Sequence, residues 1–388
     1  MNPPGTFTLP ALLVALVTLL PARASADAEP VKGWVEPGSM PLTPSDLQPW
    51  SGGGTSFESY DFWIWLDDGR YLKLQYVVTS MRAGFFRIER QGSLKAVVAP
   101  IGAETTDETK EGVFRARRGF SGQDGEWMAS EEGLNLVFDD CYLRSDGQTM
   151  HLALMDDRVK TELELKLTRP LWRAGDGVTR FGWDGETTMT EHILPRFEVT
   201  GRVSTRRSKK DPESWQSVTG RGYGEHRRTS AFPSSVGERW AGFRALRDDG
   251  LTITMNHLQT PDTYGHATEG WLTVSLGDQV LFASRDLVLQ PLDVRNQKIE
   301  PSNYPVLYGY RVVARSGADE VQLTVTDGHL QLRENPLASV SPVLRAVLAS
   351  ALAPMDYELS NRYDATLRIG GATASVAGSG WTTLSYPK

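Results

Sequence analysis

One ten-residue stretch concentrates the side chains that could do chemistry. Residues 219–228 carry three alternating glycines and then a carboxylate, an imidazole and two guanidinium groups, with Tyr223, Glu225 and His226 among them. Protonation of an apolar double bond needs a general acid whose pKa is raised by a dry pocket, and Glu225 or His226 could supply it. Adjacent residues of a regular strand point to opposite faces, so both enter one cavity only if a bulge intervenes. The alternative, which these residue types favour, is a satisfied hydrogen-bond network that holds two parts of the protein together.

Other catalytic and metal-binding patterns are missing from the sequence. The glycines do not fit the G-x-G-x-x-G spacing of a phosphate loop, and there is no Gly-x-Ser-x-Gly elbow. The six histidines form no His-x-x-x-His pair, although His257 and His266 could approach each other on one hairpin. We therefore expect no metal and no cofactor. The single Cys141 is interpreted as a buried small hydrophobe.

Aromatic residues gather at two predicted hairpins. Trp63 and Trp65 belong to the first, and Trp240 belongs to the second. Phe62 and Trp63 are adjacent, so both faces of that strand are apolar, as expected if one meets a core and the other a second barrel or a ligand. Together with Tyr223, these three tryptophans are the expected ligand-binding residues. Plain core packing is the favoured alternative.

The elements that must position these residues are strands. Residues 71–78 and 161–167 alternate apolar with polar, which places one face in a core and the other in water. Roughly 18 to 20 such runs follow one another at the spacing of sandwiches or barrels, which is too many for one small barrel. Only residues 341–354 have the spacing of a helix, with Ser341 as N-cap. The sequence therefore predicts an all-β protein with one C-terminal helix that closes a barrel end.

The central stretch also resembles a known family. Residues 194–201, followed by Gly-x-Gly-Tyr-x-Glu-His at 220–226, look like the domain junction of the survival-factor family and its carotenoid-hydratase and attachment-protein relatives. Glu225 stands where these relatives usually have Asp, and Arg227 stands where they have Asn. The resemblance implies two consecutive lipocalin-like antiparallel β-barrels.

We expect the first barrel at residues 55–195 and the second at 196–388, after an extended lead-in at 27–54. The resemblance further implies an interior for lipids or isoprenoids. Some relatives bind or carry such molecules, and others hydrate or isomerise them. The survival-factor branch is associated with survival of oxidative stress.

The N-terminus has the pattern of a signal peptide. A short apolar run at residues 9–20 precedes Ala24-x-Ala26, and the run is too short for the roughly 20 residues of a membrane span. We expect cleavage of residues 1–26 and export to the periplasm or the medium; a short uncleaved anchor is the alternative. The net charge of −7 gives no reason to expect nucleic acid as a partner.

Three functions remain open from the sequence. The leading hypothesis is an exported, non-catalytic carrier of a hydrophobic small molecule, with transient membrane contact left open and no indication of the oligomeric state. Its rival is a hydratase or isomerase of an isoprenoid or lipid, with Glu225 as proton donor and His226 or Tyr223 orienting it. The third hypothesis is a structural or protein-interaction module in which both barrels are filled, so that no ligand is bound.

Overall fold

The computed structural model describes residues 47, 55–83, 86–104, 112–120, 125–130, 133–169, 171–174, 177–182, 185, 187–299, 302–339 and 353–387. The predicted leader lies outside these residues. So do the predicted lead-in, apart from Leu47, and the predicted helix at 341–354, apart from its last two positions. Cleavage and export therefore stay predictions. In the part of the chain that is described, no helix has the length and apolar character needed to cross a membrane.

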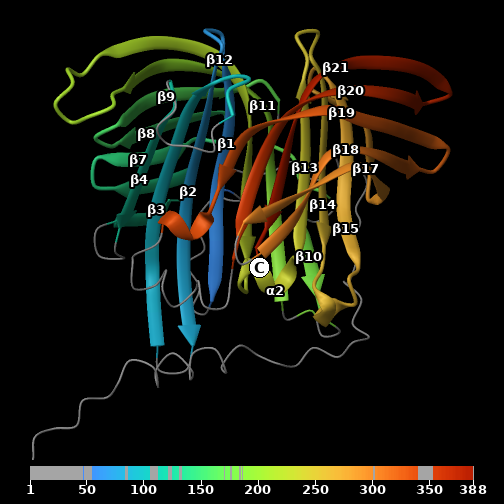
Figure 1. Ribbon diagram of the computed structural model, residues 1–388, viewed down its shortest axis with the longest axis horizontal. Helices are drawn as coiled ribbons and strands as arrows, with labels where there is room; N and C mark the ends of the chain where they lie inside the picture. The colour runs from blue at the N-terminus through green and yellow to red at the C-terminus, as the bar shows by residue number, and fades with distance from the viewer. Residues whose placement is uncertain are drawn as a thin grey trace, which may run out of the picture.

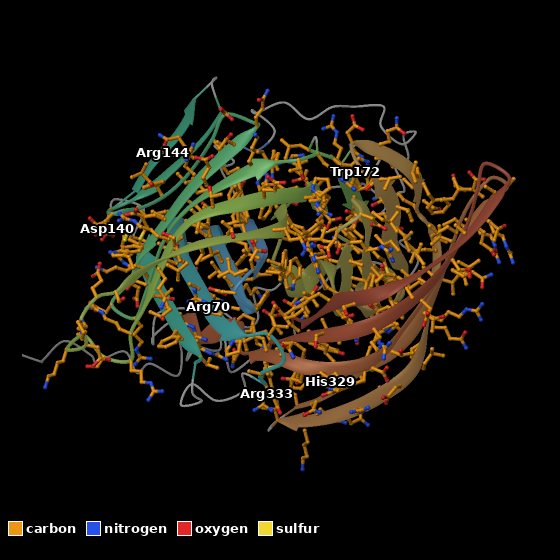
Figure 2. The ribbon with its side chains drawn as sticks, turned by 90° about the horizontal axis from the view of Figure 1, so that it is seen from above. Arg70, Asp140, Arg144, Trp172, His329 and Arg333 are labelled. Atoms are coloured by element: carbon orange, nitrogen blue, oxygen red, sulfur yellow. The ribbon has the colours of Figure 1, made fainter. Side chains whose placement is uncertain are left out.

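Two antiparallel sheets account for most of these residues, and the all-β class is confirmed (Figure 1). The first has twelve strands in the order β4-β3-β2-β1-β12-β11-β9-β8-β7-β6-β5, with β10 beside β11. The second has nine in the order β16-β15-β14-β13-β21-β20-β19-β18-β17. Both sheets curve strongly and stand side by side, as the view from above shows (Figure 2).

The first sheet comprises β1 (Ser56–Leu66), β2 (Arg70–Ala83), β3 (Phe86–Pro100), β4 (Phe114–Phe120), β5 (Gly125–Ser130), β6 (Gly133–Phe138), β7 (Cys141–Ser145), β8 (Thr149–Met155), β9 (Val159–Leu167), β10 (Val178–Phe181), β11 (Thr187–Thr205) and β12 (Trp215–Thr229).

The second sheet comprises β13 (Arg239–Leu246), β14 (Leu251–Gln259), β15 (Thr268–Leu276), β16 (Gln279–Ser284), β17 (Asp286–Ile299), β18 (Ser302–Ser316), β19 (Asp319–Glu334), β20 (Met355–Ile369) and β21 (Ala372–Tyr386). Short helical turns accompany the strands: α2 (Pro233–Val236), η2 (Asp262–Tyr264) and η3 (Pro336–Ser339).

The chain passes from the first sheet to the second between β12 and β13, across α2. The predicted division at residues 195–196 lies inside β11, which continues to Thr205 and pairs with both β9 and β12. The β11–β12 hairpin thus completes the first sheet, and the extents of the sheets differ from the predicted barrel ranges.

Each sheet wraps its own apolar core because its strands alternate. On β1, Tyr60, Phe62 and Ile64 point into the core of the first sheet. Gly224 and Gly222 of β12 lie opposite Phe62 and Ile64 and make room for large rings: a Cβ on Gly222 would lie 2.3 Å from the ring of Phe197. The intervening residues of β12 therefore point away from this core, towards the second sheet.

Candidate functional site

A cavity of about 360 Å³ lies between the facing surfaces of the two sheets. Strands β1, β2, β3, β10, β11 and β12 line it on one side, and strands β13, β14, β15, β20 and β21 line it on the other. Each sheet keeps its own apolar core on its other face. The candidate site is consequently between the sheets rather than inside either one.

A row of polar side chains crosses the first wall of this cavity. Strand pairing sets Glu225 on β12 opposite Asp61 on β1, Asp61 opposite Gln75 on β2, and Gln75 opposite Lys95 on β3. Residues paired in this way share one face of a sheet, and all four line the cavity. Gln75 donates a hydrogen bond from Nε2 to Asp61 Oδ1 at 2.6 Å. The row places two carboxyl groups on neighbouring strands of one wall.

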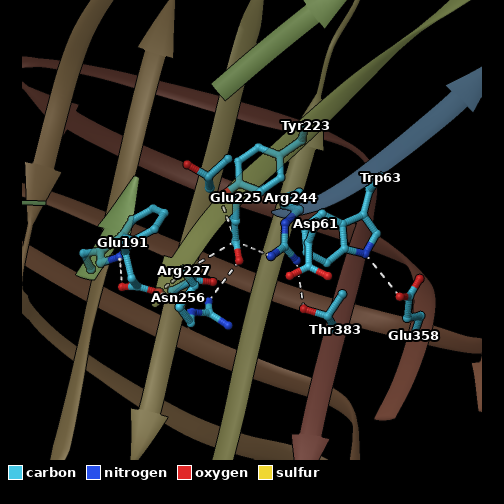
Figure 3. Close-up of polar contacts among 12 residues, drawn as sticks. Asp61, Trp63, Glu191, Tyr223, Glu225, Arg227, Arg244, Asn256, Glu358 and Thr383 are labelled. Atoms are coloured by element: carbon cyan, nitrogen blue, oxygen red, sulfur yellow. Dashed lines mark hydrogen bonds and ion pairs between the residues drawn. The ribbon is translucent and has the colours of Figure 1, made fainter. Parts of the chain in front are cut away.

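Glu225 is held as a carboxylate by donors from both sheets (Figure 3). Its Oε1 accepts hydrogen bonds from Arg244 Nη2 at 2.5 Å, Tyr223 Oη at 2.9 Å and Asn256 Nδ2 at 3.2 Å, while Oε2 accepts from Arg227 Nη2 at 2.9 Å. Burial by itself would raise the pKa of Glu225, but the charges of Arg244 and Arg227 outweigh it and hold the pKa at about 2. Glu225 is therefore ionised at neutral pH.

Glu358 on β20 joins the sheets in the same way. It forms an ion pair with Lys73 Nζ at 2.6 Å, and it accepts hydrogen bonds from Trp63 Nε1 at 3.2 Å, Trp381 Nε1 at 3.0 Å and the hydroxyl of Tyr71. Four donors saturate this carboxylate. Lys73 and Glu358 thus form a closed pair on the cavity wall.

Two other carboxyl groups of the lining have their pKa values shifted in the opposite direction from that of Glu225. Burial raises the pKa of Asp61, and the negative charge of Glu225 adds to the shift, while Lys73 opposes it. Burial likewise raises the pKa of Asp356, whose Oδ1 accepts a hydrogen bond from Ser385 at 2.6 Å. Asp61 and Asp356 are therefore the cavity carboxyl groups best suited to hold a proton.

Apolar residues supply much of the remaining lining. Besides Trp63 and Trp240, they include Phe57, Val77, Met189, Phe232, Trp271, Leu258, Leu337 and Leu384. Arg227 packs its guanidinium group 4.5 Å from the ring centroid of Trp240. The cavity therefore combines a charged wall with apolar surface, which suits a ligand that has both characters.

His226 lies on the opposite face of β12 from Glu225. It stacks on Tyr60 at 4.3 Å, its Nε2 lies 2.6 Å from Glu58 Oε1, and its Nδ1 lies 3.3 Å from Nδ1 of His192. Of this cluster only Glu58 reaches the cavity lining. Glu225 and His226 therefore do not meet in one cavity.

Of the four predicted ligand-binding residues, two line the cavity and two do not. Trp63 and Trp240 line the cavity. Tyr223 is buried behind it and orients Glu225, and Trp65 packs against Tyr71 and Trp381 between the sheets, outside the lining. Seven further site residues were not among the predicted ones: Asp61, Lys73, Gln75, Lys95, Arg244, Asp356 and Glu358. Lys73 and Gln75 occupy polar positions of the alternating segment 71–78, whose polar face was predicted to lie in water, and this alternation is the signal that could have found them.

Among the residues that the structure describes, no group of three or more His, Cys, Asp or Glu side chains could hold a metal ion. His257 is buried at the cavity, whereas His266 is exposed and bonds to Glu238 at 2.9 Å. Cys141 is buried, and its burial raises the pKa of the thiol to about 11.

Comparison with known proteins relates this architecture to one family. The AttH-like family model matches residues 92–334. No curated protein matches the chain by sequence. The attachment-protein part of the sequence resemblance is thereby confirmed, and its survival-factor branch stays a prediction.

Solved structures share the fold at low identity. The structure of a protein from Nitrosomonas europaea assigned as AttH is 15% identical with a TM-score of 0.60, covering 92% of this chain and 100% of that one. Kievitone hydratase from Nectria haematococca is 14% identical with a TM-score of 0.57, over 93% and 97% of the two chains. CghA with bound Sch210972 is 12% identical with a TM-score of 0.53, over 92% and 95%. Likeness at these identities shows a shared lipocalin-like fold.

Proposed function

Since the chain belongs to the AttH-like family, we propose that it is a hydratase or isomerase that protonates a carbon–carbon double bond of an unsaturated lipid or isoprenoid in the cavity between the sheets. One observation carries the proposal: two buried carboxyl groups, Asp61 and Glu225, face each other across neighbouring strands with pKa values shifted in opposite directions. Hydration, the reaction for which the structural neighbour kievitone hydratase is named, supports the reaction class.

The opposed shifts assign the roles. In many active sites, two neighbouring titratable groups have different surroundings that push their pKa values apart. One group then keeps its proton and acts as the acid, while the other stays charged. Glu225, with a pKa of about 2, has no proton to donate at neutral pH, so the donor role expected for it passes to Asp61. Glu225 then supplies fixed negative charge close to the carbon that becomes positive.

The step balances without a cofactor. The carboxyl proton of Asp61 adds to one alkene carbon, and the π electrons form the new C–H bond. In hydration, the oxygen of a water molecule bonds to the other carbon and its proton returns to the Asp61 carboxylate. In isomerisation, that carboxylate removes a proton from a neighbouring carbon, so the double bond re-forms one position away.

The test is turnover by the purified full chain and by Asp61→Asn. Kievitone, geraniol and squalene serve as unsaturated probes. Chromatography coupled to mass spectrometry detects hydration as a gain of one water, and isomerisation as a new peak of unchanged mass. We expect a loss of kcat of about 10²- to 10⁴-fold in Asp61→Asn, as for removal of a general acid. Asp364→Asn, on the exposed side of β20, is the matched control and should leave kcat unchanged.

A carrier is the second candidate, and the apolar part of the lining favours it. A carrier would bind a probe at one molecule per chain, return it chemically unchanged, and bind it equally well as Asp61→Asn. That result would refute the proposed enzymatic activity and support the carrier function. Turnover that survives in Asp61→Asn would instead refute the assignment of the acid.

A further inference from the structure

One lysine on the cavity wall differs from the other basic side chains there. Lys95 on β3 is 7% exposed and lines the cavity. It makes no hydrogen bond and no ion pair with any residue that the structure describes. The other basic side chains of the lining each have a partner: Lys73 pairs with Glu358, Arg244 pairs with Glu225, Arg227 pairs with Glu225 and with Glu191, and Arg285 donates a hydrogen bond to Thr179.

The carboxyl groups near Lys95 are already engaged elsewhere. Glu334 accepts a hydrogen bond from Arg117 Nη2 at 2.7 Å, and Asp356 accepts one from Ser385. Both feel the charge of Lys95 without touching its ammonium group. A buried ammonium ion is costly unless it is paired, and it carries three donors. These donors are therefore left for a molecule in the cavity.

We propose that Lys95 binds the oxyanion of the substrate, so that the substrate is an amphiphilic organic acid: a carboxylate, phenolate or enolate head on an unsaturated apolar body. The word substrate rests on the proposed function, whereas the oxyanion site does not. The ligand should have an anionic group for Lys95 and an apolar body for the apolar lining. A neutral polar molecule lacks the first, and an inorganic anion lacks the second.

The sheet also sets where the reacting bond lies. Asp61 and Lys95 belong to β1 and β3, with β2 between them, and both side chains point from one face. Adjacent strands are about 4.8 Å apart, so the acid and the oxyanion site are separated by about 10 Å. The double bond that Asp61 protonates is consequently remote from the head, and Gln75 between them can contact the polar linkage.

A matched pair of fluorescent probes tests the site without a known substrate. 8-Anilinonaphthalene-1-sulfonate and N-phenyl-1-naphthylamine share their aromatic body and differ in the anionic group. We expect Lys95→Met to bind the sulfonate at least about tenfold more weakly, with the affinity for the neutral probe unchanged, as for loss of a charged hydrogen bond. Lys95→Arg should retain most of the affinity for the sulfonate.

The controls separate binding from folding. Lys166→Met removes an exposed lysine of β9 and should change neither affinity. If Lys95→Met unfolds at lower urea than the native chain, Lys95→Gln repeats the comparison with a polar side chain. An equal loss for both probes, or no loss for the sulfonate, would overturn the proposal. Failure of the Asp61→Asn test leaves this measurement intact, because no turnover enters it.

Discussion

Replacing Glu225 with Gln removes the charge at the centre of the contact between the sheets. Gln keeps an oxygen that can accept from Tyr223, but Arg244 loses its carboxylate partner and stays buried with only the Thr383 hydroxyl, among the described residues, to accept from it. Arg227 retains Glu191 at 2.9 Å. The variant should therefore lose stability mainly through one uncompensated guanidinium group.

The size of the loss follows from the pKa. The pKa of Glu225 falls from an ordinary value of 4.5 to about 2 on folding, and each pKa unit corresponds to about 1.4 kcal/mol. The ionised carboxylate thus contributes about 3 kcal/mol. Because the folded pKa is depressed, this contribution is complete above pH 4.5 and is lost as the pH falls towards 2.

Urea unfolding followed by tryptophan fluorescence measures this contribution to the free energy of unfolding. At pH 7 we expect Glu225→Gln to unfold with a free energy about 3 kcal/mol below that of the native chain, and the difference should narrow steadily between pH 4.5 and pH 2.5. Glu164→Gln, on the exposed face of β9, should differ by less than about 0.5 kcal/mol throughout. A difference at pH 7 that persists unchanged at pH 2.5 would refute the charge argument, and no difference at pH 7 would refute the network.

Three further outcomes follow from burial. Gly222→Ala should lower the free energy of unfolding by about 1–3 kcal/mol, because its Cβ meets Phe197, whereas Gly119→Ala, with open space around it, should change it little; urea titration compares them. Burial, followed by Arg239, lowers the pKa of His257 from 6.5 to about 4, so stability should fall by up to about 3 kcal/mol as the pH drops through that window, and a flat profile in native protein would contradict this. Cys141 should react with a thiol reagent only after unfolding, and rapid labelling of the native chain would count against its burial.

The strands could be predicted because their periodicity is local. On β2, the apolar positions Leu72 and Leu74 enter the core of the first sheet, as the alternation indicates. The polar positions Lys73 and Gln75 were assigned to water, yet both line the cavity and Lys73 is 8% exposed. Alternation distinguishes the two faces of a strand, but it carries no information about whether a second sheet covers the polar one.

The division of the chain was harder to predict for a similar reason. The division was predicted at residues 195–196, within the stretch that resembles a domain junction. In the structure this stretch belongs to β11, and β11 and β12 complete the first sheet through contacts with β9 and β1. Such pairing joins segments far apart in the chain, and no local pattern encodes it.

The charged partners that Glu225 and Glu358 have on the opposite sheet could not be predicted from the sequence. Arg244 and Lys73 each cross the gap between sheets to meet a carboxylate. The sequence left a choice between a network that joins two parts of the protein and a catalytic site, and the geometry makes these compatible. Buried ion pairs are weak evidence for stability, since apolar side chains of similar volume often serve as well. Their place on a cavity wall is better explained by the fixed field they create, in which Asp61 keeps a raised pKa and Lys95 is left for a ligand.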